Sequence, residues 1–160
     1  MFYRTIESPI GPLLAAGDEE GLRFLLFTRG RDRATPKADW EPDRSALKET
    51  ARQLSAYFTG KLHAFDLLVA PEGTPFQQSV WQQLQRIPYG ETISYGELAR
   101  RLGNPKAVRA VGLANGSNPI SIVIPCHRVV GTNGKLVGYG GGLPIKQALL
   151  ALERGQRRLL

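Results

Sequence analysis

The only cysteine among 160 residues lies in the segment Pro125-Cys126-His127-Arg128, directly after the apolar run from Ile120 to Ile124. A cysteine attacks as its thiolate, and a thiolate forms near neutral pH only beside a base or a positive charge. His127 and Arg128 supply one of each. A lone buried cysteine is more often an inert small side chain, yet this context favours a nucleophile.

The position of Cys126 beside His127 limits how the two side chains can cooperate. The β-prone run Ile120–Ile124, stopped by Pro125, predicts a buried strand with Cys126 at its end. Adjacent residues of an extended strand point to opposite faces. Coupling between the thiol and the imidazole therefore requires a bend in the chain or a bridging water.

Two segments after the cysteine are typical of turns. Asn133-Gly134, between Val130 and Leu136, predicts a hairpin. Tyr139 then precedes three consecutive glycines, whose bare backbone lets a flat ligand approach closely. A flexible linker would have the same composition.

Glu153 is a further candidate because of its place in the last predicted helix, 144–154. It lies in the final turn, where the helix dipole disfavours an anion. Either Glu153 has a cationic or hydrogen-bonding partner, or it is a solvated side chain beside Arg154. The predicted core face of this helix consists of Ile145, Ala148, Leu149 and Leu152.

A helix-turn-helix is predicted before the cysteine. Its first helix runs over 95–102, its turn is Gly103-Asn104-Pro105, and its second helix begins near Lys106. Lys106 and Arg109 share one face of the second helix. We favour a nucleic-acid contact there over a packing helix with solvated cations. The predicted inner face is narrow and consists of Ala107, Ala110, Val111 and Ala114.

The segment Thr74-Pro75-Phe76-Gln77 has the pattern of a capping box with proline at the first helical position. It predicts a helix that ends near Arg86. The apolar residues of this helix at core spacing are Phe76, Val80, Trp81 and Leu84.

The first half of the chain is predicted to contain a small sheet followed by one helix. Strands are predicted over 3–8, 11–17 and 21–28 as an antiparallel meander, followed by a loop over 28–44. A helix over 45–60 ends at Gly60. The break near Pro71–Pro75 places a domain boundary between residues 1–73 and 74–160. The helical spacing that supports this helix is that of Leu47, Ala51, Leu54 and Phe58.

Charge follows the same division. Residues 1–75 hold 10 Lys/Arg against 11 Asp/Glu, whereas residues 76–160 hold 11 against 3. A basic half indicates a polyanion partner, or merely a solvated surface. A single cysteine allows no internal disulfide, and two histidines form no clustered zinc pattern. With no secretion signal or apolar membrane-length stretch, we expect a cytoplasmic protein without a metal or cofactor.

Taken together, the segments SYGELA, RAVG, IPCHRVV and GYGGG resemble the O6-alkylguanine-DNA alkyltransferases, also called methylated-DNA–protein-cysteine methyltransferases, of the bacterial single-function type. The resemblance extends from SPIG near the N-terminus to Glu153. It implies an α+β fold: a small antiparallel sheet with a helix, ribonuclease H-like, followed by a helical winged-helix or helix-turn-helix domain that carries the active site.

The resemblance also implies roles at matching positions. Cys126 would be the nucleophile and alkyl acceptor, His127 would activate it through a water, and Glu153 would orient the histidine. Asn118 would hold the turn that positions the site. Tyr95 would assist rotation of the nucleotide and protonation of the departing base.

On the DNA side, Arg109 would enter the base stack in place of the flipped nucleotide, with contact through the minor groove. Tyr139, Gly140 and Gly141 would form the guanine pocket, and Gly140 stands where some relatives carry a hydroxyl residue. The family acts as a monomer; cooperative binding on DNA stays open. The expected DNA contacts are Ser94, Tyr95, Lys106, Arg109, Ala110, Asn115, Gly116 and Arg128.

Two other function classes use part of the same set. A Cys-His-Glu hydrolase would use the same three residues with the glycine loop as an oxyanion site, but it leaves the basic second half unexplained. A non-catalytic lesion sensor would keep the helix-turn-helix and Arg109, but it needs no thiol. Ester turnover would identify the first class, and failure to accept an alkyl group the second.

Overall fold

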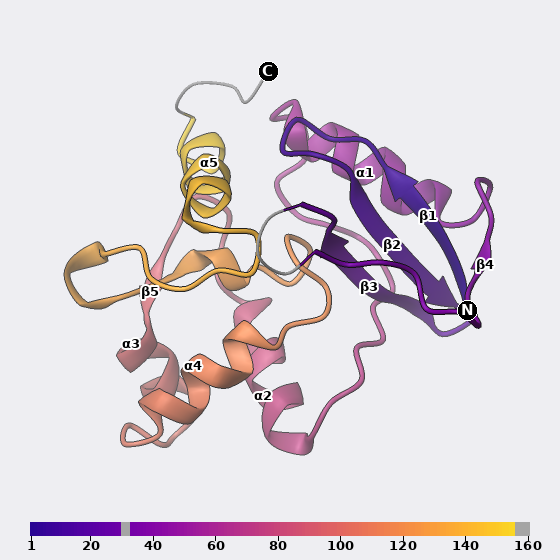
Figure 1. Cartoon of the computed structure of the whole chain (residues 1–160). Coiled ribbons are helices and arrows are strands. Elements are labelled where there is room, and N and C mark those ends of the chain that lie inside the picture. Colours follow the sequence, from indigo (N-terminus) through magenta and orange to yellow (C-terminus); the bar gives the residue numbers. More distant parts are fainter. Residues whose placement is uncertain (30–32, 156–160) are drawn as a thin grey trace.

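The computed structural model describes residues 1–29 and 33–155 of the chain. A sheet with one helix on its face forms the N-terminal half, and four α-helices with four shorter elements form the C-terminal half beside it (Figure 1). This arrangement confirms the expected α+β class. None of the helices in the described ranges is both long and apolar enough to cross a membrane.

The N-terminal sheet contains β1 (Phe2–Ile6), β2 (Leu13–Asp18), β3 (Gly21–Phe27) and β4 (Glu41–Pro42), in the order β3-β2-β1-β4. The first three strands form the predicted antiparallel meander. β4 lies inside the segment predicted as a loop and pairs with β1 in parallel. Two residues carry too little pattern to predict a strand, and its proline is tolerated because it lies at the sheet edge.

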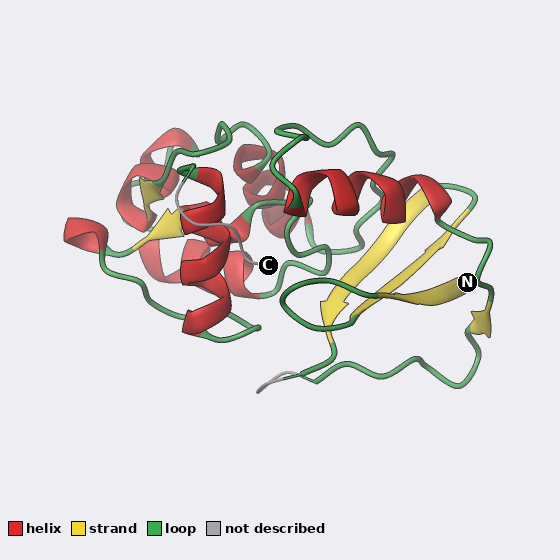
Figure 2. Cartoon of the chain, turned by 90° about the horizontal axis from the view of Figure 1, so that it is seen from above, coloured by secondary structure: helices red, strands yellow, loops and turns green. Residues whose placement is uncertain are grey.

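Helix α1 (Lys48–Phe58) covers one face of this sheet (Figure 2). Its start is later than predicted because Leu47, at the N-cap, has a left-handed backbone with φ of 58°. Its end agrees with the glycine stop, since Gly60 has φ of 77°. The face toward the sheet includes Leu54, Tyr57 and Phe58, all of them buried.

The C-terminal half begins with α2 (Pro75–Leu84), and the predicted capping box is present. The backbone N–H of Gln77 donates to the Thr74 hydroxyl over 3.1 Å, and the Thr74 N–H donates to the Gln77 side chain over 2.9 Å. Phe76 was wrongly predicted as a core residue, because it is 39% exposed in the first turn, beyond the packed part of the helix. The other predicted core residues, Val80, Trp81 and Leu84, are buried.

The helix-turn-helix consists of α3 (Tyr95–Arg101) and α4 (Val108–Gly116). Lys106 precedes α4, so it lies in the turn and not on the helix. Ala110 is exposed, which corrects its place on the inner face. The inner face is instead formed by Val111, Ala114 and Asn115, all buried.

The segment before the cysteine is buried, as predicted, but it does not form the predicted strand. Ile120 makes a single bridge to Leu25 of β3, and the chain then turns at Ile122, which has φ of 72°. Cys126–Arg128 forms a short 3-10 helix, η1. This turn supplies the bend that coupling between Cys126 and His127 requires.

The remaining elements frame this turn. β6 (Val129–Val130) pairs in parallel with β5 (Ile93–Ser94), so the predicted hairpin between Val130 and Leu136 is wrong. The Asn133-Gly134 turn itself is present as part of a short 3-10 helix, η2 (Thr132–Gly134), with both residues at positive φ. Helix α5 (Leu143–Glu153) follows the glycines.

The two halves share one hydrophobic core that contains residues from β2, β3, α1, α2, α3, α4 and α5. The outer edge of β3 is also bonded to later backbone: Leu25 donates to the carbonyl of Pro119 over 2.9 Å, and Ser121 donates to Leu25 over 3.0 Å. These bonds satisfy an otherwise open sheet edge. They also attach the segment that leads to Cys126 to the N-terminal sheet.

Candidate active site

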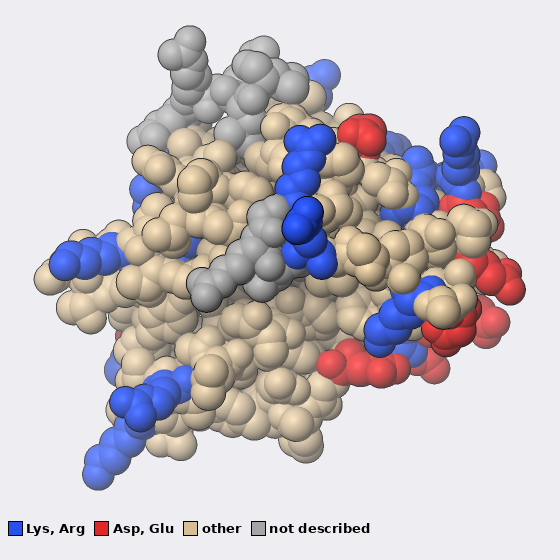
Figure 3. Space-filling model, in the orientation of Figure 1, with Lys and Arg blue, Asp and Glu red and all other residues tan. Residues whose placement is uncertain are grey.

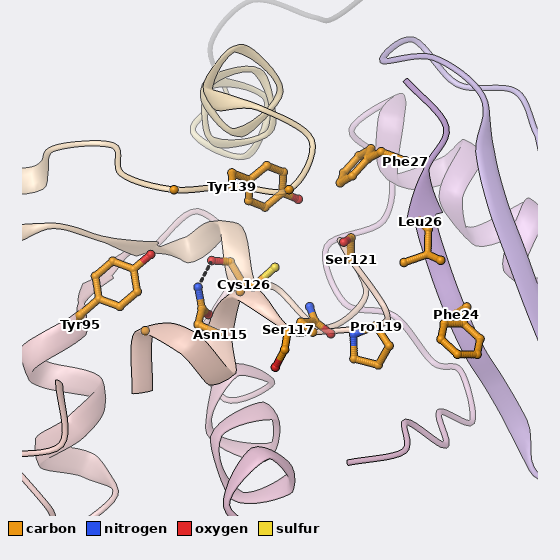
Figure 4. Close-up of a pocket in the computed structure, with 15 residues that line it drawn as sticks. Phe24, Leu26, Phe27, Tyr95, Asn115, Ser117, Pro119, Ser121, Cys126 and Tyr139 are labelled. Atoms are coloured by element: carbon orange, nitrogen blue, oxygen red, sulfur yellow. Dashed lines mark hydrogen bonds between the residues drawn. The ribbon is translucent and has the colours of Figure 1, made fainter. Parts of the chain in front are cut away.

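A cavity of about 590 Å³ lies between the two halves and contains Cys126 in its wall. Figure 4 shows Tyr95 on one side of the cysteine, the β3 residues Phe24, Leu26 and Phe27 on the far side, and Tyr139 above it. Residues from α4, from the loop before the cysteine and from the glycine segment around Tyr139 complete the wall. These further lining residues are Gly112, Asn115, Gly116, Ser117, Asn118, Pro119, Ser121, Gly138 and Gly140.

Cys126 is 6% exposed at the start of η1. Burial raises the pKa of its thiol, while the Asn118 side chain and the charge of Lys146 act in the opposite direction. The resting side chain is therefore a thiol that needs a base before it can attack.

Asn118 holds the loop before the cysteine in its turn. Its amide nitrogen donates to the carbonyl of Ile124 over 2.8 Å, and its oxygen accepts from the N–H of Ile120 over 3.0 Å. These two bonds take the place of strand pairing, and they explain why an apolar, β-prone run forms a turn here. Asn118 is thus where the expected role requires it.

His127 lies against Glu153 inside the protein. His127 Nε2 is 2.6 Å from Glu153 Oε2, and neither side chain is exposed. A carboxylate only accepts, so Nε2 carries the hydrogen and Nδ1 is left as an acceptor. Nδ1 is buried without a hydrogen-bond partner in the part of the chain that the structure describes. Burial lowers the pKa of His127, and the charge of Glu153 acts in the opposite direction. The lowered pKa favours the neutral imidazole, which is the form that can act as a base.

The carboxylate of Glu153 receives four more hydrogen bonds. Arg128 donates from Nε to Oε1 over 2.7 Å and from Nη2 to Oε2 over 3.1 Å. The N–H of Gly90 donates to Oε1 over 3.2 Å, and the hydroxyl of Tyr57 donates to Oε2 over 2.6 Å. Burial alone would raise the pKa of Glu153, but the bonds from His127 and Arg128 hold it well below its usual range. Glu153 is therefore a buried anion, and not a solvated one.

These contacts correct the role predicted for Arg128. Its side chain is buried, pairs with Glu153, and donates from Nη1 to the carbonyl of Ile87 over 2.7 Å. A guanidinium held in this way does not reach DNA. It explains instead how an anion is stable at the C-terminal end of α5.

Two buried side chains near the site, each with a polar end, were missed from sequence. Tyr57 lies on the inner face of α1, where a tyrosine signals a buried hydroxyl that needs a partner, but no pattern identifies Glu153 as that partner. Lys146 is fully buried on α5, and its ammonium donates to the carbonyls of Val129 over 2.7 Å and Val137 over 2.9 Å. A lysine at an inward-facing position of a predicted helix is a signal of a buried ammonium that sequence analysis could have detected.

Tyr139 and its glycines form the upper wall. The ring of Tyr139 packs edge-on against Phe27 with centroids 5.6 Å apart. Its hydroxyl oxygen is buried and lacks a hydrogen-bond partner among the described residues. Gly140 lines the cavity, whereas Gly141 packs against Phe27, where an added Cβ would lie 2.9 Å from the ring. Gly141 therefore supports the wall from behind, which corrects its predicted place in the pocket.

The predicted DNA contacts divide into two groups. Arg109, Lys106, Ala110 and Gly116 are exposed on or beside α4. Asn115 is buried and lines the cavity, with its amide 3.4 Å from the carbonyl of Cys126. The structure thus places Asn115 inside the site rather than on the outer helix face.

The other two predicted contacts lie at the start of α3. Ser94 caps this helix by accepting from the N–H of Glu97 over 3.0 Å. Tyr95 is half-buried in the cavity wall, and burial raises its pKa. In the view of Figure 3, acidic side chains gather at the right, where Lys and Arg also lie, whereas the charged side chains visible at the left are mostly Lys and Arg.

Comparison with known proteins agrees with this site. Residues 1–71 match the model of the "6-O-methylguanine DNA methyltransferase, ribonuclease-like domain", and residues 75–155 match the "6-O-methylguanine DNA methyltransferase, DNA binding domain". A methylated-DNA–protein-cysteine methyltransferase of Methanosarcina barkeri is 58% identical over 99% of this chain and 100% of its own length. The protein of that name from Mycobacterium tuberculosis is 53% identical over 96% of this chain and 93% of its own.

Solved structures give the same result. The crystal structure of Mycobacterium tuberculosis OGT in complex with DNA superposes with a TM-score of 0.91, at 53% identity, and covers 97% of this chain and 94% of that one. A methyltransferase from Methanococcus jannaschii superposes with a TM-score of 0.67 at 26% identity, over 96% of this chain and 95% of its own. Both halves of the chain therefore have counterparts in these proteins.

Proposed function

The chain belongs to the 6-O-methylguanine DNA methyltransferase family, and from this membership and the geometry of the site we infer that it is a methylated-DNA–protein-cysteine methyltransferase. It binds DNA and repairs it by moving the alkyl group of O6-alkylguanine onto its own cysteine. The observation that carries the assignment is the thiol of Cys126 in the wall of an interdomain cavity, next to a buried His127–Glu153 pair.

In the proposed reaction, His127 takes the thiol proton of Cys126 through a water at Nδ1. The buried Nδ1, which lacks a protein partner within the described residues, supports this role. Glu153 stabilises the imidazolium that forms, because it accepts the hydrogen on Nε2. The Asn118 bonds support a fixed position for the sulfur.

The thiolate then attacks the alkyl carbon in line with the departing oxygen. A carbon–sulfur bond forms as the carbon–oxygen bond breaks, and the electron pair stays on the purine, which takes a proton from Tyr95 to become guanine. The place of Tyr95 in the cavity wall supports this proton donor. The product is a thioether without a carbonyl for water to attack, so each molecule reacts once.

The base reaches the thiol only after it leaves the DNA helix. Flipping costs a few kcal/mol, least for a weakly paired damaged base. We propose that α4 enters the minor groove, where little sequence information is read. Arg109, exposed on α4, would then fill the gap in the stack. Tyr139 and Gly140 would contact the flipped guanine.

Three further expectations are also proposals: the domain boundary, the monomeric state and the cytoplasmic location. The domain boundary at residues 73–74 is supported by the gap between the two family matches, 1–71 and 75–155. A monomer in the cytoplasm would suit a protein whose single cysteine has to stay reduced.

The test is the intact mass of the protein after mixing with a duplex that carries one O6-methylguanine, followed by peptide mapping. We expect an increase of one methyl group that saturates at one per molecule and maps to Cys126. An unchanged mass with retained lesion binding would indicate a sensor. Turnover of an ester substrate would indicate a hydrolase.

A further inference from the structure

We propose that Tyr57, in the N-terminal half, is a positioning residue for alkyl transfer: its hydroxyl holds Glu153, and through Glu153 it sets the orientation and charge of His127. This inference rests on the proposed function. It makes the N-terminal half part of the catalytic apparatus, although every residue expected to act on the substrate lies in the C-terminal half.

The first argument is geometric. Tyr57 and His127 both bond to the same oxygen, Glu153 Oε2, each over 2.6 Å. Tyr57 and Glu153 are 96 residues apart in the chain, and both are buried. Because two short bonds converge on one oxygen, a change at the hydroxyl of Tyr57 alters the charge and position that His127 meets.

The second argument is the rigidity of the tyrosine ring. Phe58 packs edge-on against it and Phe65 lies tilted beside it, both with centroids 5.3 Å away, and Tyr89 packs edge-on at 6.2 Å. Three aromatic neighbours thus hold the ring, and its hydroxyl donates to Glu153. A donor held in this way loses little conformational entropy when it bonds.

The third argument concerns charge. Burial and the nearby charge of Glu153 raise the pKa of Tyr57 well above 10, so its hydroxyl remains a donor at all working pH values. A donor on Oε2 withdraws part of the negative charge that would otherwise stabilise imidazolium. Tyr57 therefore keeps His127 in the neutral form that can accept a proton.

Other charged and titratable groups surround His127, and the test has to leave them unchanged. They are Glu153 and Lys146 from α5 and Arg128 from η1, and beyond them Tyr89 and Tyr139, whose hydroxyls are influenced by the charge of Glu153. The thiol of the neighbouring residue, Cys126, is the group that His127 deprotonates in the proposed reaction.

The experiment measures the rate of alkyl transfer from an O6-methylguanine duplex in the whole protein and in Tyr57→Phe, which keeps the ring. We expect a rate about tenfold lower, because Glu153 and with it His127 lose the hydroxyl that fixes their orientation, and tenfold is the usual order for loss of one bond to a charged group. The acid limb of the pH–rate profile should move to higher pH, because His127 protonates more easily. DNA affinity should not change. Tyr3→Phe, a hydroxyl loss at the far side of the sheet, is the matched control and should behave as the unmodified protein.

A double-mutant cycle with Glu153→Gln tests whether Tyr57 acts through Glu153. We expect Tyr57→Phe to slow transfer in the parent but to add little in the Glu153→Gln background. If Tyr57→Phe does not fold, 3-fluorotyrosine at position 57 keeps the ring and strengthens the donor, and the acid limb should then move to lower pH.

An unchanged rate and profile in Tyr57→Phe would overturn the proposal, as would an equal loss in both backgrounds without a shift in the profile. Absence of transfer in the unmodified protein would instead contradict the proposed function, so the two failures are distinguishable.

Discussion

Arg128 is buried against Glu153 whereas Arg109 is exposed on α4, so we expect substitution of Arg128 to lower stability and substitution of Arg109 to lower DNA affinity. Arg128→Met would remove the buried partner of Glu153, including its bonds over 2.7 Å and 3.1 Å, and would leave the carbonyl of Ile87 without a donor. Breaking one side of a buried ion pair costs about 3–5 kcal/mol. For a protein of this size we expect a fall in Tm of roughly 10 °C.

The assay is thermal unfolding followed by circular dichroism, with DNA affinity measured by fluorescence anisotropy below the transition. Arg128→Met should bind undamaged duplex as the unmodified protein does, because the guanidinium that it removes does not lie at the surface. Arg109→Ala is the matched comparison: its Tm should change by no more than about 1 °C, since an exposed side chain contributes little to stability. A Tm for Arg128→Met within about 2 °C of the parent, which corresponds to roughly 1 kcal/mol or less for a chain of this length, would refute the buried role. A loss of DNA affinity equal to that of Arg109→Ala would refute it too.

Four other outcomes follow from the site. Cys126→Ala should abolish alkyl transfer and retain DNA binding, as mass spectrometry and anisotropy would show. Arg109→Ala should slow transfer from a duplex about tenfold or more but leave transfer from the free base unchanged; equal losses on both substrates, in single-turnover kinetics, would contradict its place in the stack. Asn118→Ala should lower the free energy of unfolding by about 3 kcal/mol in urea titrations, because two buried backbone groups lose their partners. The pKa of Glu153 is lower in the folded state than in the unfolded state, so the ionised Glu153 stabilises the fold above its unfolded pKa, about 4.3, and this stabilisation is lost as pH falls toward the folded pKa. Glu153→Gln should therefore flatten the dependence of Tm on pH in the acid range. An unaltered slope of Tm against pH would contradict this.

The elements with strong local signals could be predicted from sequence. The meander, the capping box at Thr74 and the glycine stop at Gly60 each depend on residues close together in the chain. The site cysteine and its histidine were identifiable for the same reason, since they are adjacent. Local physical chemistry is sufficient for such features.

The errors occur where distant residues decide the structure. The run from Ile120 to Ile124 is apolar because it is buried, but Asn118 and the edge of β3 fold it into a turn. Arg128 was predicted as a DNA contact, and nothing nearby in sequence shows that Glu153 pairs with it. Ala110 was placed on the inner face because alanine fits either face of a helix.

The bond between Tyr57 and Glu153 also bears on how the chain reaches its reactive form. During synthesis Cys126 leaves the ribosome before Glu153, and the nascent thiol has no assembled base while the last helix is missing. Contacts over 96 residues form late, because closing so long a loop costs entropy before any contact compensates for it. A protein that reacts only once would thus acquire its activated thiol only when the last helix has docked against both halves.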